Sequence, residues 1–202
     1  MWLVLASASP RRRELLGRLG LPFEVRPSGV DEVLRADLPA ADQATALARA
    51  KAADVAARLG ARAGAGVVLG ADTLVVLDAR PIGKPGSRDE ARAMLRALRG
   101  RTHEVVTAVA ALAVPQGREV RAAVTSRVTM RPFTDGEIDA YVATGEPDDK
   151  AGAYGAQGLG ARLVARIEGC VTNVIGLPLT TTARLLRALG LEPVLPGDVP
   201  GR

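Results

Sequence analysis

The pattern of apolar and polar residues is clearest between residues 66 and 85, where two apolar runs flank a short polar segment. Residues 67–69 and 74–77 are all Val or Leu, which is typical of a strand covered on both faces. Between them lies Gly-Ala-Asp-Thr (70–73); a glycine within a strand indicates a close backbone approach, and a carboxylate there is costly unless something binds it. A turn at 78–81 and Gly-Lys-Pro (83–85) follow. We interpret this as a hairpin-like platform that directs Asp72 and Lys84 into one site, the alternative being a capping aspartate and a solvated lysine.

Periodicity and capping residues predict the other elements. Strands are expected at residues 2–6, 23–25, 103–114, 119–132 and 161–168, with an extended segment at 172–175. Helices are expected at residues 10–20, 43–59, 89–98, 135–143 and 178–189, the first four capped by Ser9, Asp42, Ser87 and Thr134, the last of these with Glu137 in a capping box. The two long strands that flank the turn at 115–117 are expected to pair antiparallel. Without a repeat or a linker, residues 1–202 are expected to form one α/β domain with a frayed tail from about residue 192.

The helix predicted at residues 10–20 carries Arg11, Arg12 and Arg13 in its first turn. The helix dipole disfavours cations there. Free backbone N–H groups together with arginines form a good phosphate site. We therefore favour phosphate binding over the alternative, a basic first turn on an exposed helix, because the arrangement is unfavourable without an anion.

Lysine is rare in this chain. Of 27 basic residues only Lys51, Lys84 and Lys150 are lysines, so each is expected where a compact ammonium is required and a guanidinium is not accepted, although chance would also explain the pattern. The apolar face expected for the helix at 43–59 comprises Ala46, Leu47, Ala50, Ala53 and Ala57. Lys51 lies one residue off that face, so it either reaches across a cleft or is solvated.

Composition narrows the class of protein. The chain has 202 residues, 48% of them hydrophobic, and no apolar run that approaches the length of a membrane span. One cysteine, Cys170, excludes internal disulfides and cysteine metal clusters, and the single histidine, His103, argues against zinc. These features are consistent with a reducing cytoplasm.

The net charge of +5 favours an anionic partner. Aromatic residues make up only 2% of the chain and the arginines are dispersed, so base-stacking surfaces for nucleic acid are scarce. A small polyanion such as a nucleotide is the better candidate. A second unusual segment, residues 144–158, combines four glycines with Lys150 and Gln157, and its backbone can approach a ligand closely.

Over nearly its whole length the chain resembles the Maf family of nucleoside triphosphate pyrophosphatases. The matching segments are Ser7-Ala8-Ser9-Pro10-Arg11-Arg12, Val30-Asp31-Glu32, Lys51, Gly70-Ala71-Asp72-Thr73, Gly83-Lys84-Pro85, Glu146-Pro147 with Asp149-Lys150-Ala151-Gly152-Ala153-Tyr154-Gly155, Gln157-Gly158 and Gly176-Leu177-Pro178-Leu179. Each motif alone is weak, but their order and spacing together are strong. The resemblance implies a mixed, twisted sheet in two lobes around a nucleotide cleft. It also implies metal-assisted hydrolysis to the monophosphate and pyrophosphate, in the cytoplasm.

The resemblance extends to the dTTP/UTP branch of that family, which carries an arginine, a threonine and a glutamine where this chain has Arg11, Thr73 and Gln157. An amide offers both a donor and an acceptor, which matches N3–H and O4 of uracil or thymine. Modified pyrimidine nucleotides remain open as substrates. Neither nucleic acid nor a membrane is expected as a partner, and a homodimer remains open.

We expect Asp72 to activate the attacking water, directly or through a metal-bound water, with Glu32 as the second carboxylate of a Mg²⁺ or Mn²⁺ site. Lys51 and Lys84 are expected to neutralise charge that develops on the phosphates. Ser9, Arg11, Arg12, Thr73, Lys150 and Gln157 are the expected substrate-binding residues. Two alternatives remain: a nucleotide-binding regulator of septum formation with little turnover, and an enzyme that removes damaged purine nucleotides such as ITP, which Gln157 and Thr73 disfavour.

Overall fold

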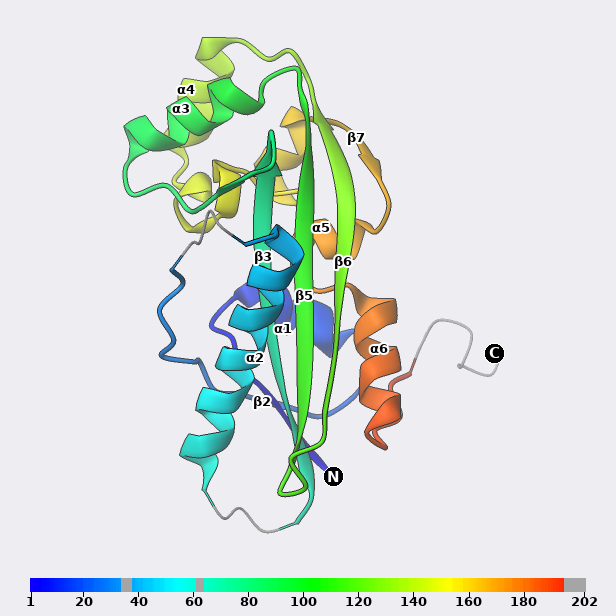
Figure 1. Ribbon diagram of the computed structural model, residues 1–202. Coiled ribbons are helices and arrows are strands. Elements are labelled where there is room, and N and C mark those ends of the chain that lie inside the picture. Colours follow the sequence, from blue (N-terminus) through cyan, green and yellow to red (C-terminus); the bar gives the residue numbers. More distant parts are fainter. Residues whose placement is uncertain (34–37, 61–63, 195–202) are drawn as a thin grey trace, which may run out of the picture.

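A mixed seven-stranded sheet forms the centre of the computed structural model, which describes residues 1–33, 38–60 and 64–194 (Figure 1). Parts of two expected loops and most of the expected tail therefore lie outside the described residues. The strands are β1 (Trp2–Leu5), β2 (Glu24–Val25), β3 (Gly66–Leu77), β4 (Arg80–Ile82), β5 (Thr102–Val114), β6 (Glu119–Met130) and β7 (Val164–Glu168). Their order is β2-β1-β3-β5-β6-β7, with β4 paired to β3. β2, β1 and β3 run parallel and the other pairs are antiparallel, which confirms the expected hairpin at β3–β4 and the pair β5–β6.

Six α-helices and three 3₁₀ turns cover the described part of the sheet. They are α1 (Pro10–Gly17), α2 (Ala40–Leu59), α3 (Arg88–Leu98), α4 (Asp135–Ala143), η1 (Glu146–Asp149), η2 (Ala151–Ala153), η3 (Gly158–Leu163), α5 (Val171–Ile175) and α6 (Leu179–Ala188). Three of the predicted caps are present: Ser9, Ser87 and Thr134 each accept a backbone N–H at the start of a helix, the last within a capping box.

Two apolar clusters on one face of the sheet create two lobes that share β3 and β5. In the first lobe, leucines of α1 and α6 pack against Val67 and Leu69 of β3. In the second lobe, at the other end of the strands, α3 and α4 pack around Val75 and Leu77 (Figure 1). Helix α2 covers the opposite face of β3 and β5. The expected α/β architecture with two lobes is confirmed.

Strand β3 has an open edge at its middle. On that side β1 pairs with β3 as far as Leu69, and β4 pairs with it from Val75 onward. None of the described strands pairs with the edge between these points. Asp72 and Thr73 lie on this stretch with side chains on opposite faces of the sheet, and both line the cavity described below.

Helix α2 differs from the prediction in its start and in its buried face. It begins at Ala40, so Asp42 lies within the first turn instead of capping it. The buried side chains are Gln43, Ala44, Ala48, Lys51, Ala52 and Val55, and the expected alanine face points away from the core. A helix so rich in alanine has little amphipathic signal, and tertiary contact decides which side is buried. The contact is close: a Cβ on Gly70 would lie 2.1 Å from the carbonyl oxygen of Ala48, which explains the glycine in β3.

Two C-terminal predictions were wrong. Residues 161–163 continue a 3₁₀ turn, so β7 begins at Val164. The expected extended segment is the short helix α5, in spite of its β-branched residues. The buried Asn173 explains this, because its amide accepts from Thr107 N and donates to Val105 O of β5 and so fixes the turn against the sheet.

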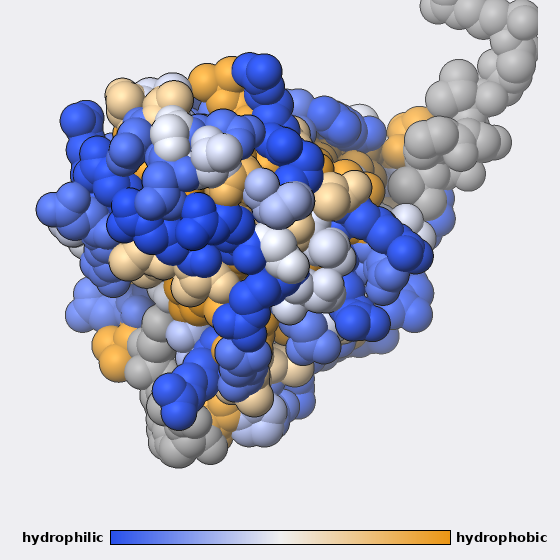
Figure 2. Space-filling view, turned by 90° about the horizontal axis from the view of Figure 1, so that it is seen from above, coloured by the Kyte–Doolittle hydropathy of each residue, from blue (hydrophilic) through white to orange (hydrophobic). Residues whose placement is uncertain are grey.

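The end of the molecule that carries α3 and α4 is largely hydrophilic (Figure 2). Arg92 and Arg96 of α3 pair with Asp139 and Asp135 of α4 at 2.7 and 3.4 Å, respectively, so these cations are locally balanced. Among the helices in the described part of the chain, none combines the length and apolar character that a membrane span requires.

Candidate active site

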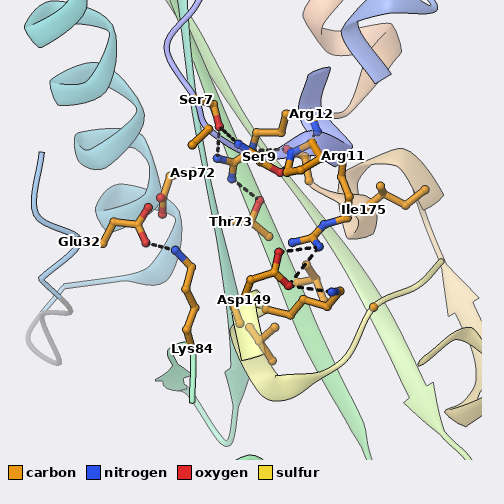
Figure 3. Close-up of a pocket in the computed structure, with 18 of the residues that line it drawn as sticks. Ser7, Ser9, Arg11, Arg12, Glu32, Asp72, Thr73, Lys84, Asp149 and Ile175 are labelled. Atoms are coloured by element: carbon orange, nitrogen blue, oxygen red, sulfur yellow. Dashed lines mark hydrogen bonds and ion pairs between the residues drawn. The ribbon is translucent and has the colours of Figure 1, made fainter. Parts of the chain in front are cut away.

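A cavity of about 370 Å³ opens at the edge of β3 between its pairings with β1 and β4 (Figure 3). Its lining includes all ten residues that the sequence predicts for the site: Ser9, Arg11, Arg12, Glu32, Lys51, Asp72, Thr73, Lys84, Lys150 and Gln157. They come from both lobes and from elements distant in sequence. The fold therefore brings together every candidate.

Two carboxylates and two lysines form a chain of ion pairs on one side of the cavity. Lys51 Nζ lies 2.7 Å from Asp72 Oδ1 and 2.5 Å from Glu32 Oε1, and Lys84 Nζ lies 2.6 Å from Glu32 Oε2. The Lys51–Asp72 pair is buried, with exposed fractions of 5% and 4% for the two residues, because α2 presses this part of its surface onto β3. Glu32 and Lys84 lie at the solvent side of the chain (Figure 3).

The two carboxylates have opposite pKa shifts. Burial raises the pKa of Asp72, and the ammonium of Lys51 only partly opposes this. Burial would also raise the pKa of Glu32, but hydrogen bonds from Lys51 and Lys84 outweigh it and lower this pKa to about 2. Glu32 therefore ionises readily, whereas Asp72 has an increased affinity for a proton. An increased proton affinity suits a general base.

Asp72 and Glu32 offer oxygen ligands that fit a divalent cation. Asp72 Oδ2 is buried and has no hydrogen-bond partner among the described residues. The described residues contain no cluster of three or more His, Cys, Asp or Glu side chains suited to a metal ion. A pair of carboxylates suits Mg²⁺, which is usually held by one or two carboxylates and completes its shell with substrate phosphates and water.

The N-terminus of α1 forms the opposite wall. Arg12 donates from Nε to Gly176 O at 2.9 Å, from Nη2 to Thr73 Oγ1 at 3.0 Å and from Nη1 to Ser7 Oγ at 3.2 Å. Burial lowers the pKa of this guanidinium. Arg12 therefore joins α1 to the sheet as well as facing the cavity. Arg13, by contrast, is exposed and does not line it.

Arg11 reaches across the cavity to the glycine-rich segment. Its Nη1 lies 3.3 Å from Asp149 Oδ2, and the same carboxylate receives Lys150 Nζ at 2.7 Å (Figure 3). Gln157 lies further along the segment, partly exposed, and its amide makes no hydrogen bond within the described part of the chain. The amide is therefore available to a ligand.

Among the lining residues that were not predicted as site residues, three carry polar side chains that bond to other side chains of the site or beside it: Ser7, Asp149 and Tyr154. Asp149 and Ser7 hold the arginines of α1, and Tyr154 shares a hydrogen bond with buried His103. All three lie within three residues of a predicted residue in sequence, but their roles depend on side-chain contacts that local patterns do not reveal.

Comparison with known proteins identifies a family and several relatives of this chain. A family model described as "Maf-like protein" matches residues 2–189. A dTTP/UTP pyrophosphatase of Moorella thermoacetica is 55% identical over 190 residues, 94% of this chain and 96% of the relative. One from Anaeromyxobacter dehalogenans is 49% identical over 98% of both chains. Among solved structures, a nucleoside-triphosphatase / dITP/XTP pyrophosphatase from Mycobacterium abscessus aligns over 94% of both chains with 18% identity and a TM-score of 0.43.

Proposed function

Because this chain belongs to the Maf-like protein family, we propose that it hydrolyses pyrimidine nucleoside triphosphates, dTTP and UTP in particular, to the monophosphate and pyrophosphate. The names of its relatives support the substrate class. The cavity between the lobes supports the reaction, since it brings acidic and basic groups together around a space suited to a nucleotide.

The observation that carries the proposal is the state of Asp72. Its carboxylate is buried, and Lys51 fixes one oxygen while the other has no partner among the described residues. We propose that this second oxygen accepts the proton of the attacking water. A raised pKa makes the carboxylate a better proton acceptor near neutral pH than a solvated aspartate.

We assign binding of the triphosphate to the cationic side of the cavity. Lys84 and Arg11 line it together with Ser9 at the N-terminus of α1, where the helix dipole favours an anion, although Pro10 has no N–H and the N–H of Arg12 is donated to Ser9. Lys51 and Lys84 would neutralise charge on the phosphoryl oxygens and on the leaving pyrophosphate.

We propose that a divalent cation, Mg²⁺ or Mn²⁺, binds with the nucleotide through Asp72 and Glu32. When bound it would supply positive charge that stabilises the phosphate oxygens. The four charged side chains of this wall, two carboxylates and two lysines, already balance one another, so the triphosphate is the natural source of the remaining ligands and of the charge that attracts the cation.

We propose that Gln157 reads the base, together with Thr73 and Arg11. Its free amide can donate to O4 and accept from N3–H of uracil or thymine. Cytosine reverses that pattern, although the amide could turn to follow it, and a purine is a larger ring for the same space.

Product analysis tests the proposed function. The protein is incubated with UTP and Mg²⁺, and the products are separated by anion-exchange chromatography. We expect UMP and pyrophosphate in equal amounts. UDP with orthophosphate would refute the proposed bond cleavage, and binding of UTP without turnover would favour the nucleotide-binding regulator instead.

A further inference from the structure

We propose that Glu146, which does not line the cavity, is a positioning residue that sets base selectivity by fixing the segment that carries Gln157. The inference rests on the proposed role of Gln157 in reading the base. It concerns a different residue, which lies behind the cavity wall.

The carboxylate of Glu146 binds the chain just beyond Gln157. Its Oε2 accepts from Leu159 N at 3.0 Å, and its Oε1 accepts from Gly160 N at 3.0 Å. Gly158 has a positive φ of +68°, and a Cβ there would lie 2.8 Å from Glu146 Oε2. The backbone therefore passes close to this carboxylate, and the positive φ makes any residue other than glycine strained at this position.

The same carboxylate also holds the backbone before Gln157, through a hydrogen bond with the hydroxyl of Tyr141. The Tyr141 hydroxyl donates to Glu146 Oε1 at 3.0 Å and accepts from Gly155 N at 3.3 Å. The next residue upstream, Tyr154, is held by a 2.6 Å hydrogen bond to buried His103. Gln157 thus lies on a short span between two points that are both bound to Glu146, directly or through one hydroxyl.

This arrangement separates the base pocket from the reacting groups. Asp72 is held by Lys51 of α2, on the opposite face of the sheet from the 3₁₀ turns. Lys150 donates to the backbone carbonyl of Glu146, a contact that does not need the side chain. Loss of the carboxylate is therefore expected to move Gln157 while the phosphate side of the cavity keeps its geometry.

Glu146→Gln is the matched change, because it keeps the shape but places an amide N–H₂ against one of three hydrogen-bond donors. The control is Glu137→Gln, which alters another carboxylate that accepts a backbone N–H, from Thr134 at 2.8 Å, at the start of α4. The measurement is kcat/KM for UTP and for GTP. In Glu146→Gln we expect the ratio of kcat/KM for UTP to that for GTP to fall at least about fivefold, while kcat/KM for GTP stays within about threefold of the unaltered protein. In the control the ratio is expected to stay unchanged.

A second background distinguishes positioning from general loosening of the fold. In Gln157→Ala, the further change Glu146→Gln is expected to leave the UTP:GTP ratio where Gln157→Ala alone puts it. An equal further fall in that background would overturn the proposal, as would an unchanged ratio in Glu146→Gln itself. If Glu146→Gln does not fold, Tyr141→Phe, which removes the hydroxyl link, must lower the ratio in the same way.

The outcome for the unaltered protein keeps the two proposals apart. Equal hydrolysis of UTP and GTP before any substitution would overturn the proposed base reading. A clear preference for UTP that survives Glu146→Gln would overturn only the positioning role.

Discussion

Replacing Lys51 with Met tests how the buried ion pair is built into the fold. Methionine keeps most of the stem and removes the ammonium that lies 2.7 Å from Asp72 Oδ1. With both residues at most 5% exposed, Asp72 would be left as a buried carboxylate without its counter-ion. Removing one partner of a buried pair typically costs about 3–5 kcal/mol of unfolding free energy, and we expect a loss in that range near neutral pH.

The loss should depend on pH in a defined direction. Burial already raises the pKa of Asp72 above its ordinary value of 3.8, and without Lys51 that pKa rises further. Between the unfolded and folded pKa values the native state binds more protons, so the unfolding free energy falls as pH rises through this window. The destabilisation by Lys51→Met is therefore expected to be smaller at about pH 5 than at about pH 8, because protonation relieves the buried charge.

Urea denaturation of the unaltered protein and of two variants at both pH values measures this. Lys84→Met is the matched control, since Lys84 is 52% exposed and its pair with Glu32 is expected to contribute at most about 1 kcal/mol. In an Asp72→Asn background the cost of Lys51→Met should fall to about 1 kcal/mol or less, because the buried charge is gone. Equal losses for the two lysine variants, or a loss that does not change with pH, would refute the reasoning.

Two further predictions concern the arginines and the base. Arg12→Ala is expected to weaken UTP binding and to lower the unfolding free energy by about 1–3 kcal/mol, because three hydrogen bonds are lost, whereas Arg11→Ala should weaken binding with little change in stability. Urea denaturation measures the stability of each variant and equilibrium titration measures its affinity for UTP. Equal losses of stability in the two variants would contradict the contacts. The unaltered protein should prefer dTTP and UTP over GTP and ATP at least about tenfold in kcat/KM. Gln157→Glu should reduce that ratio, because a carboxylate cannot donate to O4. An unchanged ratio would show that Gln157 does not read the base.

The sequence was informative where a residue broke its local pattern. Gly70 and Asp72 interrupt the apolar runs of β3, and the structure gives a physical reason for each: the close approach of α2 and the ion pair with Lys51. The rarity of lysine was similarly useful, since the cavity lining includes all three lysines. Ser9 correctly predicted the start of α1, because helix capping is a local interaction.

Features that depend on tertiary contacts could not be predicted. Alanine gives α2 little amphipathic signal, so the buried face that contains Lys51 was misplaced. The β-branched residues of α5 favour a strand, yet Asn173 holds them in a helical turn. The open edge of β3 and the support of Gln157 by Glu146 depend on pairing between distant segments, which a single sequence does not reveal.

The central claim, that Asp72 accepts the proton of the attacking water, is tested most directly by the turnover of UTP in Asp72→Asn. Asparagine keeps the shape and can still accept a hydrogen bond from Lys51 through Oδ1, but it cannot take up the proton. We expect kcat for pyrophosphate release to fall about a hundredfold or more, with a cooperative urea transition that shows an intact fold. A variant that releases pyrophosphate from UTP at a near-normal rate would contradict the account.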